Sequence, residues 1–484
     1  MRKVEGDFVQ FGEVDIADIK INTKSRDDIP KILLGLQYIY ITKKVREAVF
    51  DILEKIVPEK IDKNNGRPGM HLWQIFVLGV LRLNLNCDYD RLAELGNKHE
   101  TIRQMLGHGI LDKDFEYNYQ RLRDNIAMFT PEILEEINTL VVGAGHNLVK
   151  QNGEKIRGKC DSFVLETDVH FPTDINLLFD SIRKIVCIIA FLADEFGLSG
   201  WRKFKNNIRH VKRLHRRTQK LKKSTSKNET KKAQREQLII DAHQEYIDLV
   251  RSYILKAVET KKNIKTENTL FSNKIKDFNH FLYCANLLTD QIERRVINGE
   301  TIPQDEKIYS VFESHTEWIN KGKAGVPVEL GLRVSVVEDQ FGFILNHKVM
   351  EKITDDKIAV SIVTKTKQLF PDFSVCSFDK GYHSPSNQLE LSKLLDKVVL
   401  PRKGKLSVQA KEIETEEEFK TLRRKHSAVE SGINALEVHG LDRCPDHGID
   451  GFKRYVSLAV VARNIQQIGE IIRRRQEKQS KRAA

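Results

Sequence analysis

Three carboxylates, Asp161, Asp379 and Glu430, occur in segments whose patterns would allow their side chains to meet. Asp161 lies in an alternating, β-branched run at 155–166, which is typical of a strand. Asp379 directly follows a second such run at 374–378, and Glu430 falls in a helical pattern. A carboxylate in a central strand is costly to bury unless it is paired or binds a metal ion. Converging carboxylates suit two divalent cations about 3.5–4 Å apart, and a set of hard oxygen ligands favours Mg²⁺.

The segment around Glu430 has a helical pattern with recognisable ends. Thr415 and Glu418 form a capping box, which predicts a helix start, and Gly440 predicts the stop. Between these ends the mostly apolar stripe consists of Phe419, Leu422, His426, Val429, Ile433 and Leu436. Glu430 lies at the edge of the stripe, with Asn434 one turn later on the same side. Such a carboxylate can point into a site, or it can be a surface glutamate paired with a nearby base.

The elements that would position these residues follow a definite order. After the first strand and a long helical insertion, the patterns predict strands at 328–337 and 341–349, a helix at 355–369, a strand at 374–378, a helix at 386–395 and a strand at 397–400. This is the order of a ribonuclease H-like α/β fold, a mixed sheet flanked by helices. In that arrangement the first and fourth strands are neighbours, so Asp161 and Asp379 would lie together and the last helix would present Glu430.

The same patterns predict how the chain is divided. The expected parts are an α-helical N-terminal domain at 1–150, a catalytic domain at 151–470 with a basic helical insertion at 174–305, and a basic flexible tail at 471–484. Short helices between residues 72 and 106 are joined by tight turns. Their spacing is equally compatible with a helix-turn-helix that reads DNA and with a plain helical bundle.

Positive charge is concentrated in the insertion. The whole chain has 80 Lys and Arg against 68 Asp and Glu, a net charge of +12, which favours a polyanionic partner. Residues 201–237 alone hold fifteen Lys or Arg and two Glu. The alternative is a basic but idle surface, or one that pairs with an acidic patch elsewhere. We expect contacts to a nucleic-acid backbone from Arg202, Lys203, Lys205, Arg209, Lys212, Arg213, Arg216, Arg217, Lys220, Lys222 and Lys223.

Several classes of protein are disfavoured. The six cysteines are scattered without a C-x-x-C pair, which fits a reducing cytosol better than secretion. The apolar run at 185–193 is too short to cross a bilayer, and no signal peptide is visible, so we expect a cytoplasmic protein without a membrane partner. His439, Cys444 and His447 have no standard zinc spacing and lack a fourth ligand.

Taken together, the chain resembles the DDE transposases of bacterial insertion sequences. The resemblance rests on five blocks in the family's order: GRPGM near Gly66, DSFVLETDVHFPTD from Asp161, HTEWINKGKAGVPVELG from His315, FDKGYHSP from Phe378 and HSAVESGINALEVHGLDRC from His426. The sequence departs from the family at Ser314, where proline is expected. The tyrosine of the tyrosine-arginine-glutamate motif is missing, and Arg423 or Arg424 would supply the arginine.

The resemblance implies that Asp161, Asp379 and Glu430 are catalytic and bind two Mg²⁺ ions, for which Mn²⁺ can substitute. It also implies double-stranded DNA partners, namely terminal inverted repeats and target DNA, a homodimer or larger assembly on DNA, and a place at the bacterial nucleoid. Residues expected to support the site are Asp168, His315, Glu317, Arg424 and Asn434. Two rival interpretations stay open: a metal-dependent nuclease or resolvase of the same fold, and an inactive, transposase-derived DNA-binding protein.

Overall fold

The alternating segments form a mixed, open sheet in the computed structural model, which describes residues 2–6, 12–57, 69–109, 112, 115–320, 327–404 and 407–483. The strands are β1 (Ile156–Thr167), β2 (Glu317–Asn320), β3 (Val328–Asp339), β4 (Ile344–Met350), β5 (Phe373–Phe378), β6 (Lys397–Val399) and β7 (Arg443–Cys444). The main path is β2-β3-β1-β5-β6, with β4 also paired to β3 and β7 to β1. β1 is parallel to β5 and antiparallel to β3. The prediction that the first and fourth strands of the main series are neighbours is therefore confirmed.

The chain divides into two compact parts, each described by itself. The sheet unit consists of Met1–Asp168 and Glu317–Ala484, and the helical unit of Val169–Thr316. The expected insertion at 174–305 falls inside the helical unit. The expected boundary near residue 150 does not separate two units, because residues on both sides of it share one hydrophobic core.

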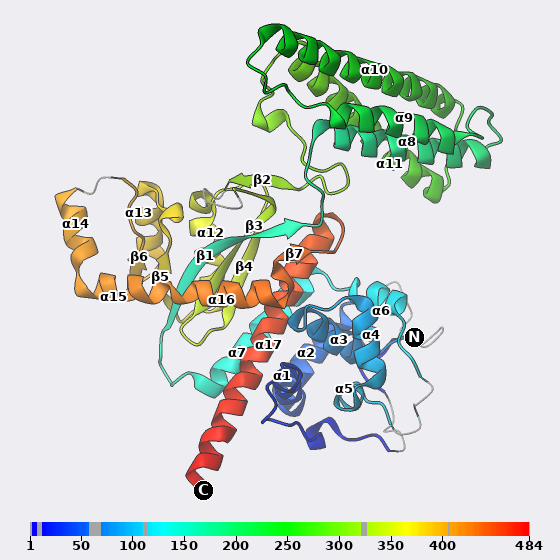
Figure 1. The fold of residues 1–484 in the computed structure, drawn as a ribbon. Coiled ribbons are helices and arrows are strands. Elements are labelled where there is room, and N and C mark those ends of the chain that lie inside the picture. Colours follow the sequence, from blue (N-terminus) through cyan, green and yellow to red (C-terminus); the bar gives the residue numbers. More distant parts are fainter. Residues whose placement is uncertain are drawn as a thin grey trace. The chain divides into compact units, whose positions relative to one another are not determined.

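Helices cover both faces of the sheet. Those that follow the first sheet strands are α12 (Asp355–Leu369), α13 (Pro385–Leu394), α14 (Val408–Thr415), α15 (Glu417–His426), α16 (Ala428–Leu436) and α17 (Gly448–Ala483). On one face, Asn346 of β4 donates to the Ile362 carbonyl of α12. On the other, His347 bonds Ser457 of α17, and α15 and α16 run across the strands (Figure 1). Because side chains alternate along a strand, neighbouring residues of β1 face different helices.

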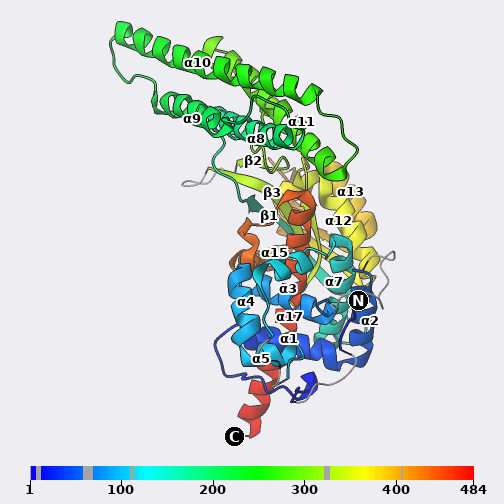
Figure 2. The same cartoon turned by 90° about the vertical axis from the view of Figure 1, so that its right-hand side faces the viewer.

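The N-terminal helices pack around α17 instead of forming a separate domain. They are α1 (Ile29–Ile41), α2 (Lys43–Glu54), α3 (Leu72–Asn84), α4 (Tyr89–Lys98), α5 (Glu100–Met105), α6 (Tyr119–Ile126) and α7 (Pro131–Val149). α1, α3 and α7 contact α17, which runs between them in Figure 2. The close approach of α1 to α17 uses two glycines. A Cβ at Gly35 would lie 2.0 Å from the Ile465 carbonyl oxygen, and one at Gly469 would lie 1.8 Å from that of Lys31.

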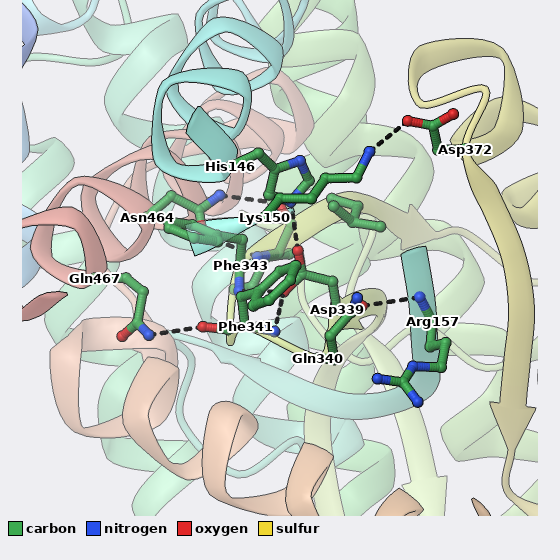
Figure 3. A network of polar contacts seen from close by, with 12 residues as sticks. His146, Lys150, Arg157, Asp339, Gln340, Phe341, Phe343, Asp372, Asn464 and Gln467 are labelled. Carbon is green, nitrogen blue, oxygen red and sulfur yellow. Dashed lines mark hydrogen bonds and ion pairs between the residues drawn. The ribbon is translucent and has the colours of Figure 1, made fainter. Parts of the chain in front are cut away.

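A buried polar network joins α7 and α17 to the β3–β4 turn (Figure 3). Asp339 accepts hydrogen bonds from the Phe341 and Phe343 amides, at 2.8 and 2.9 Å, and its other oxygen lies 2.6 Å from His146 Nε2. Asn464 of α17 accepts from the Ile344 amide. Because a buried carboxylate without partners would destabilise the fold, these contacts fix the turn and attach the N-terminal helices to the sheet.

The helical unit has its own hydrophobic core. Its long helices are α8 (Asp174–Glu195), α9 (Phe204–Lys220), α10 (Glu229–Lys262) and α11 (Thr269–Ile292). α8 packs against the other three, and the buried side chains of this part form a cluster of their own. None of the helices in the described ranges is both long and apolar enough to cross a membrane.

Two local predictions near the C-terminus are wrong. Thr415 ends α14 instead of capping the next helix, and Glu416 is the N-cap of α15 without a side-chain cap bond. The expected flexible tail is helical through Ala483, because α17 continues into it. Arg473 pairs with both Glu470 and Glu477, one turn away on either side, and such pairs stabilise a charged helix end.

Candidate functional site

Asp161 and Asp379 come from adjacent parallel strands at matching positions. Cys160 of β1 pairs with Phe378, the last residue of β5, so the two aspartates are the next residues on each strand. Neighbouring strands are about 4.8 Å apart, which places the two backbones side by side. Asp161 is half-buried, and Asp379 lies exposed where the chain leaves β5.

The turn after β5 is anchored by a backbone cap and by a buried tyrosine. Asp379 Oδ2 accepts the Gly381 amide at 3.2 Å and caps a short 3-10 turn, Lys380–Tyr382. The Tyr382 ring is 1% exposed, and its hydroxyl lies 2.8 Å from Ser335 Oγ of β3. This buried anchor fixes the backbone that carries Asp379.

Helix α16 brings Glu430 to the same region. A Cβ at Gly432 would lie 1.7 Å from Glu338 Oε2, so α16 passes close to this side chain of β3, and a larger residue would displace the carboxylate. Glu338 forms a nearly buried ion pair with Lys159 at 2.8 Å. Lys159 and Asp161 are two residues apart on β1 and therefore share the face that α16 covers. Glu430 is exposed, in the first turn of α16.

The pKa of Asp161 depends on the charged groups that lie near it. Its pKa is raised from 3.8 to about 6, chiefly by burial and also by the charges of Asp379, Asp355 and Glu430, against a lowering bond from the Ser162 amide. Like charges close together disfavour ionisation. Asp379 and Glu430, both expected from the sequence, therefore lie within electrostatic range of Asp161, together with a fourth carboxylate.

Asp355 is the residue that sequence reasoning missed. It is the first residue of α12, and its Oδ1 accepts a hydrogen bond from Ser162 Oγ at 2.7 Å. A Cβ at Gly381 would lie 3.2 Å from Asp355 Oδ2 and 3.6 Å from Asp379 Oδ2, so both oxygens lie around one point. Its sequence position carries little signal, because an aspartate in the first turn of a helix ordinarily complements the helix dipole.

His426 is a second residue near the carboxylates whose position the sequence did not reveal. It precedes Glu430 by one turn, and its Nδ1 lies 3.0 Å from Ser377 Oγ of β5. Its Nε2 is buried and has no hydrogen-bond partner among the residues that the structure describes. Burial lowers the pKa of His426, while the charges of Asp379 and Glu430 raise it. His426 therefore links α15 to β5 close to Asp379.

Four of the five expected supporting residues have other surroundings. Asp168 lies seven residues beyond Asp161, about 23 Å along an extended strand, and pairs with Arg443 at 3.7 Å. Glu317 accepts the Lys352 amide and belongs to β2, which pairs at Gly331, beside Glu166. His315 contacts Glu313 in the helical unit, and Arg424 is exposed and paired with Glu417. Asn434 is exposed one turn after Glu430.

The carboxylate oxygens of this site are suited to a hard divalent cation, but in this conformation the side chains lie too far apart to bind one ion together. Carboxylate oxygens are the ligands that Mg²⁺ prefers, and a cation would relieve the repulsion that raises the pKa of Asp161. Across the described part of the chain, no three His, Cys, Asp or Glu side chains lie close enough to hold one ion together. Joint ligation by three carboxylates therefore requires side chains or α16 to move from this conformation. His439, by contrast, contacts the Asn84 carbonyl, and Cys444 the Asp446 carbonyl.

The raised pKa of Asp161 predicts a pH-dependent stability in chelator. A carboxyl whose pKa is higher in the folded chain stabilises the fold below its unfolded value, near 3.8, and loses that contribution as pH rises through about 6. The melting temperature of Asp161→Asn should therefore rise relative to wild type between pH 4.5 and 7.5. Asp168→Asn serves as control, and a difference between wild type and Asp161→Asn that stays constant with pH would contradict the assignment.

The basic residues expected to contact nucleic acid lie in and beside α9. All eleven are exposed. Seven belong to α9, and six of these, Arg209, Lys212, Arg213, Arg216, Arg217 and Lys220, line a shallow surface hollow. Lys222 and Lys223 line a second one with residues of α10. The helical unit therefore carries its positive charge on one helix and the loop that follows.

Comparison of the chain with protein-family models, curated proteins and solved structures finds no match. Parts of two of the blocks that carry the resemblance, residues 66–68 of GRPGM and the KGKAG segment, lie outside the described residues.

Proposed function

We propose that this protein is a DDE transposase with a ribonuclease H-like catalytic unit. It would bind the terminal inverted repeats of a mobile element, cleave DNA there and join the 3′ ends to target DNA. The observation that carries the proposal is that Asp379, directly after β5, and Glu430, on α16, lie within electrostatic range of Asp161 on β1, in the order that the resemblance implies. The strand order, with β1 between β3 and β5, supports the fold assignment.

The protein groups have separate roles in this proposal. Asp161, Asp379 and Glu430 would hold two Mg²⁺ ions, which supply activation of the attacking oxygen and stabilisation of the leaving oxygen at phosphorus. The Tyr382–Ser335 contact fixes Asp379, and the close approach at Gly432 fixes α16 against β3. His426 and Ser377 join α15, the helix that precedes α16 and Glu430, to β5, the strand that precedes Asp379. Attack by water and later by a DNA 3′-hydroxyl needs no covalent protein–DNA intermediate.

The test uses the full-length protein and a labelled duplex that carries the inverted repeat flanking its own gene. Cleavage and strand joining are measured in Mg²⁺, in Mn²⁺ and in EDTA. Cutting and joining in either metal and neither in EDTA is the expected result. Cutting without joining would favour a nuclease of the same fold. Sequence-specific binding without any chemistry would favour an inactive DNA-binding relative, and no binding would overturn the proposal.

A further inference from the structure

Helix α9 has a larger net positive charge than any other long helix of its unit. It contains seven Lys and Arg and no Asp or Glu. α10, its neighbour, has seven Lys and Arg but also six Asp and Glu along 34 residues. All seven cations of α9 are exposed. Because like charges on one helix face repel each other, such a surface is more stable when an anion covers it.

The other face of α9 fixes how the helix is presented. Val211, Leu214, His215 and Thr218 are buried and recur at helical spacing, and the helix packs against α8 and α10. His215 bonds Asn176 of α8, and Thr218 donates to the Ala242 carbonyl of α10. One face of the helix is therefore packed against its bundle. Only the outer face is available to a ligand, so the helix can lie along a ligand but cannot be surrounded by a groove.

Among the described residues, no carboxylate is paired with the cations in the middle of this outer face. Arg217 pairs with Glu245, and Arg209 contacts Asn206. Within the described ranges, no ion pair joins Lys212, Arg213 or Arg216 to a carboxylate, whereas Arg251, Lys262 and Lys274 of the neighbouring helices have Glu293, Glu259 and Asp277. The hollow over α9 is lined by cations alone. A cation-lined surface without internal anions is suited to external phosphates.

We propose that the outer face of α9, from Arg209 to Lys220, binds the phosphate backbone of double-stranded DNA without reading its bases. The eleven residue steps between these two ends span about 16 Å of helix, and one DNA strand carries a phosphate about every 3.4 Å of axis. Successive cations three or four residues apart can therefore follow one backbone. This inference goes beyond the carboxylate site, because it assigns a separate positioning surface in the helical unit.

The experiment compares two full-length triple variants with the same change in net charge. The test variant is Lys212→Gln, Arg213→Gln and Arg216→Gln, and the control is Arg251→Gln, Lys262→Gln and Lys274→Gln. Affinity for a labelled end duplex, a scrambled duplex and a duplex RNA is measured in EDTA over a range of salt. Circular dichroism and the melting temperature show whether each variant is folded.

The test variant should lose on the order of tenfold or more in affinity, equally for the end and scrambled duplexes. The slope of log K against log salt should become shallower by about 3, since each phosphate contact contributes about 0.9. The control should keep the wild-type slope. Equal slopes for both variants would overturn the inference while leaving the proposed function intact if the wild type still cuts DNA. Wild-type preference for the RNA duplex, or loss limited to the end sequence, would also overturn it, and a wild type that binds no duplex would overturn both proposals.

Discussion

Glu430→Gln is expected to abolish DNA cleavage while DNA binding remains. The substitution keeps the size of the side chain but removes the charge that would hold a divalent cation beside Asp161 and Asp379. Metal-assisted phosphoryl transfer depends on several kcal/mol of charge stabilisation, so the rate should fall roughly 10²–10⁴-fold. Asp161→Asn and Asp379→Asn should behave in the same way. The measurement is single-turnover cleavage of the labelled end duplex in Mg²⁺, with binding measured in EDTA.

The control for this prediction is Glu417→Gln, an exposed residue of α15 that pairs with Arg424. It should cut at the wild-type rate. Asp355→Asn decides which carboxylates matter, because Asp355 lies around the same point as Asp379 but comes from α12. If Asp355→Asn stops cleavage and Glu430→Gln does not, the third carboxylate would be contributed by α12. The catalytic role that the resemblance assigns to Glu430 would then be wrong.

Gly35→Ala should cause a large loss of stability of the sheet unit. The new Cβ would lie 2.0 Å from the Ile465 carbonyl oxygen, so α1 and α17 would have to separate where they cross. Overpacking of this kind costs about 1–3 kcal/mol or more, which exceeds the roughly 1 kcal/mol that alanine gains over glycine in a helix. The midpoint of urea unfolding, followed by circular dichroism, should fall.

Gly143→Ala provides the matched control, because Gly143 is also helical but a Cβ there would meet nothing within 4 Å. Alanine should therefore leave the midpoint unchanged or raise it. A fall of the same size in both variants would show that the α1–α17 crossing is not the cause.

Local patterns predicted much of the C-terminal half of the chain. α12 has the bounds expected for a helix at 355–369, and β5 begins one residue before the strand expected at 374–378. Both depend on periodicity within a short window. The pairing of β1 with β5 was predicted because the order of the elements is that of a ribonuclease H-like sheet, in which the first and fourth strands are neighbours.

The errors come from interactions that a local pattern does not contain. Nothing near Ile29 indicates that α1 packs on a helix more than 400 residues later, so an N-terminal domain was expected in place of a shared core. The charged tail was expected to be flexible, although pairs such as Arg473–Glu470 stabilise it as helix. Asp355 was overlooked because only the fold brings the start of α12 to Ser162 and Gly381.

The long insertion between β1 and its partners affects the order in which the protein can be assembled during synthesis. β1 ends at Thr167 and its antiparallel neighbour begins at Val328, so at about 5–20 residues per second the ribosome needs roughly 8–32 s to supply that neighbour. The helical unit has its own hydrophobic core and can fold in this interval. Asp161 meets Asp379 and Glu430 only after nearly the whole chain has been made, so a nascent or prematurely ended chain contains no complete carboxylate site.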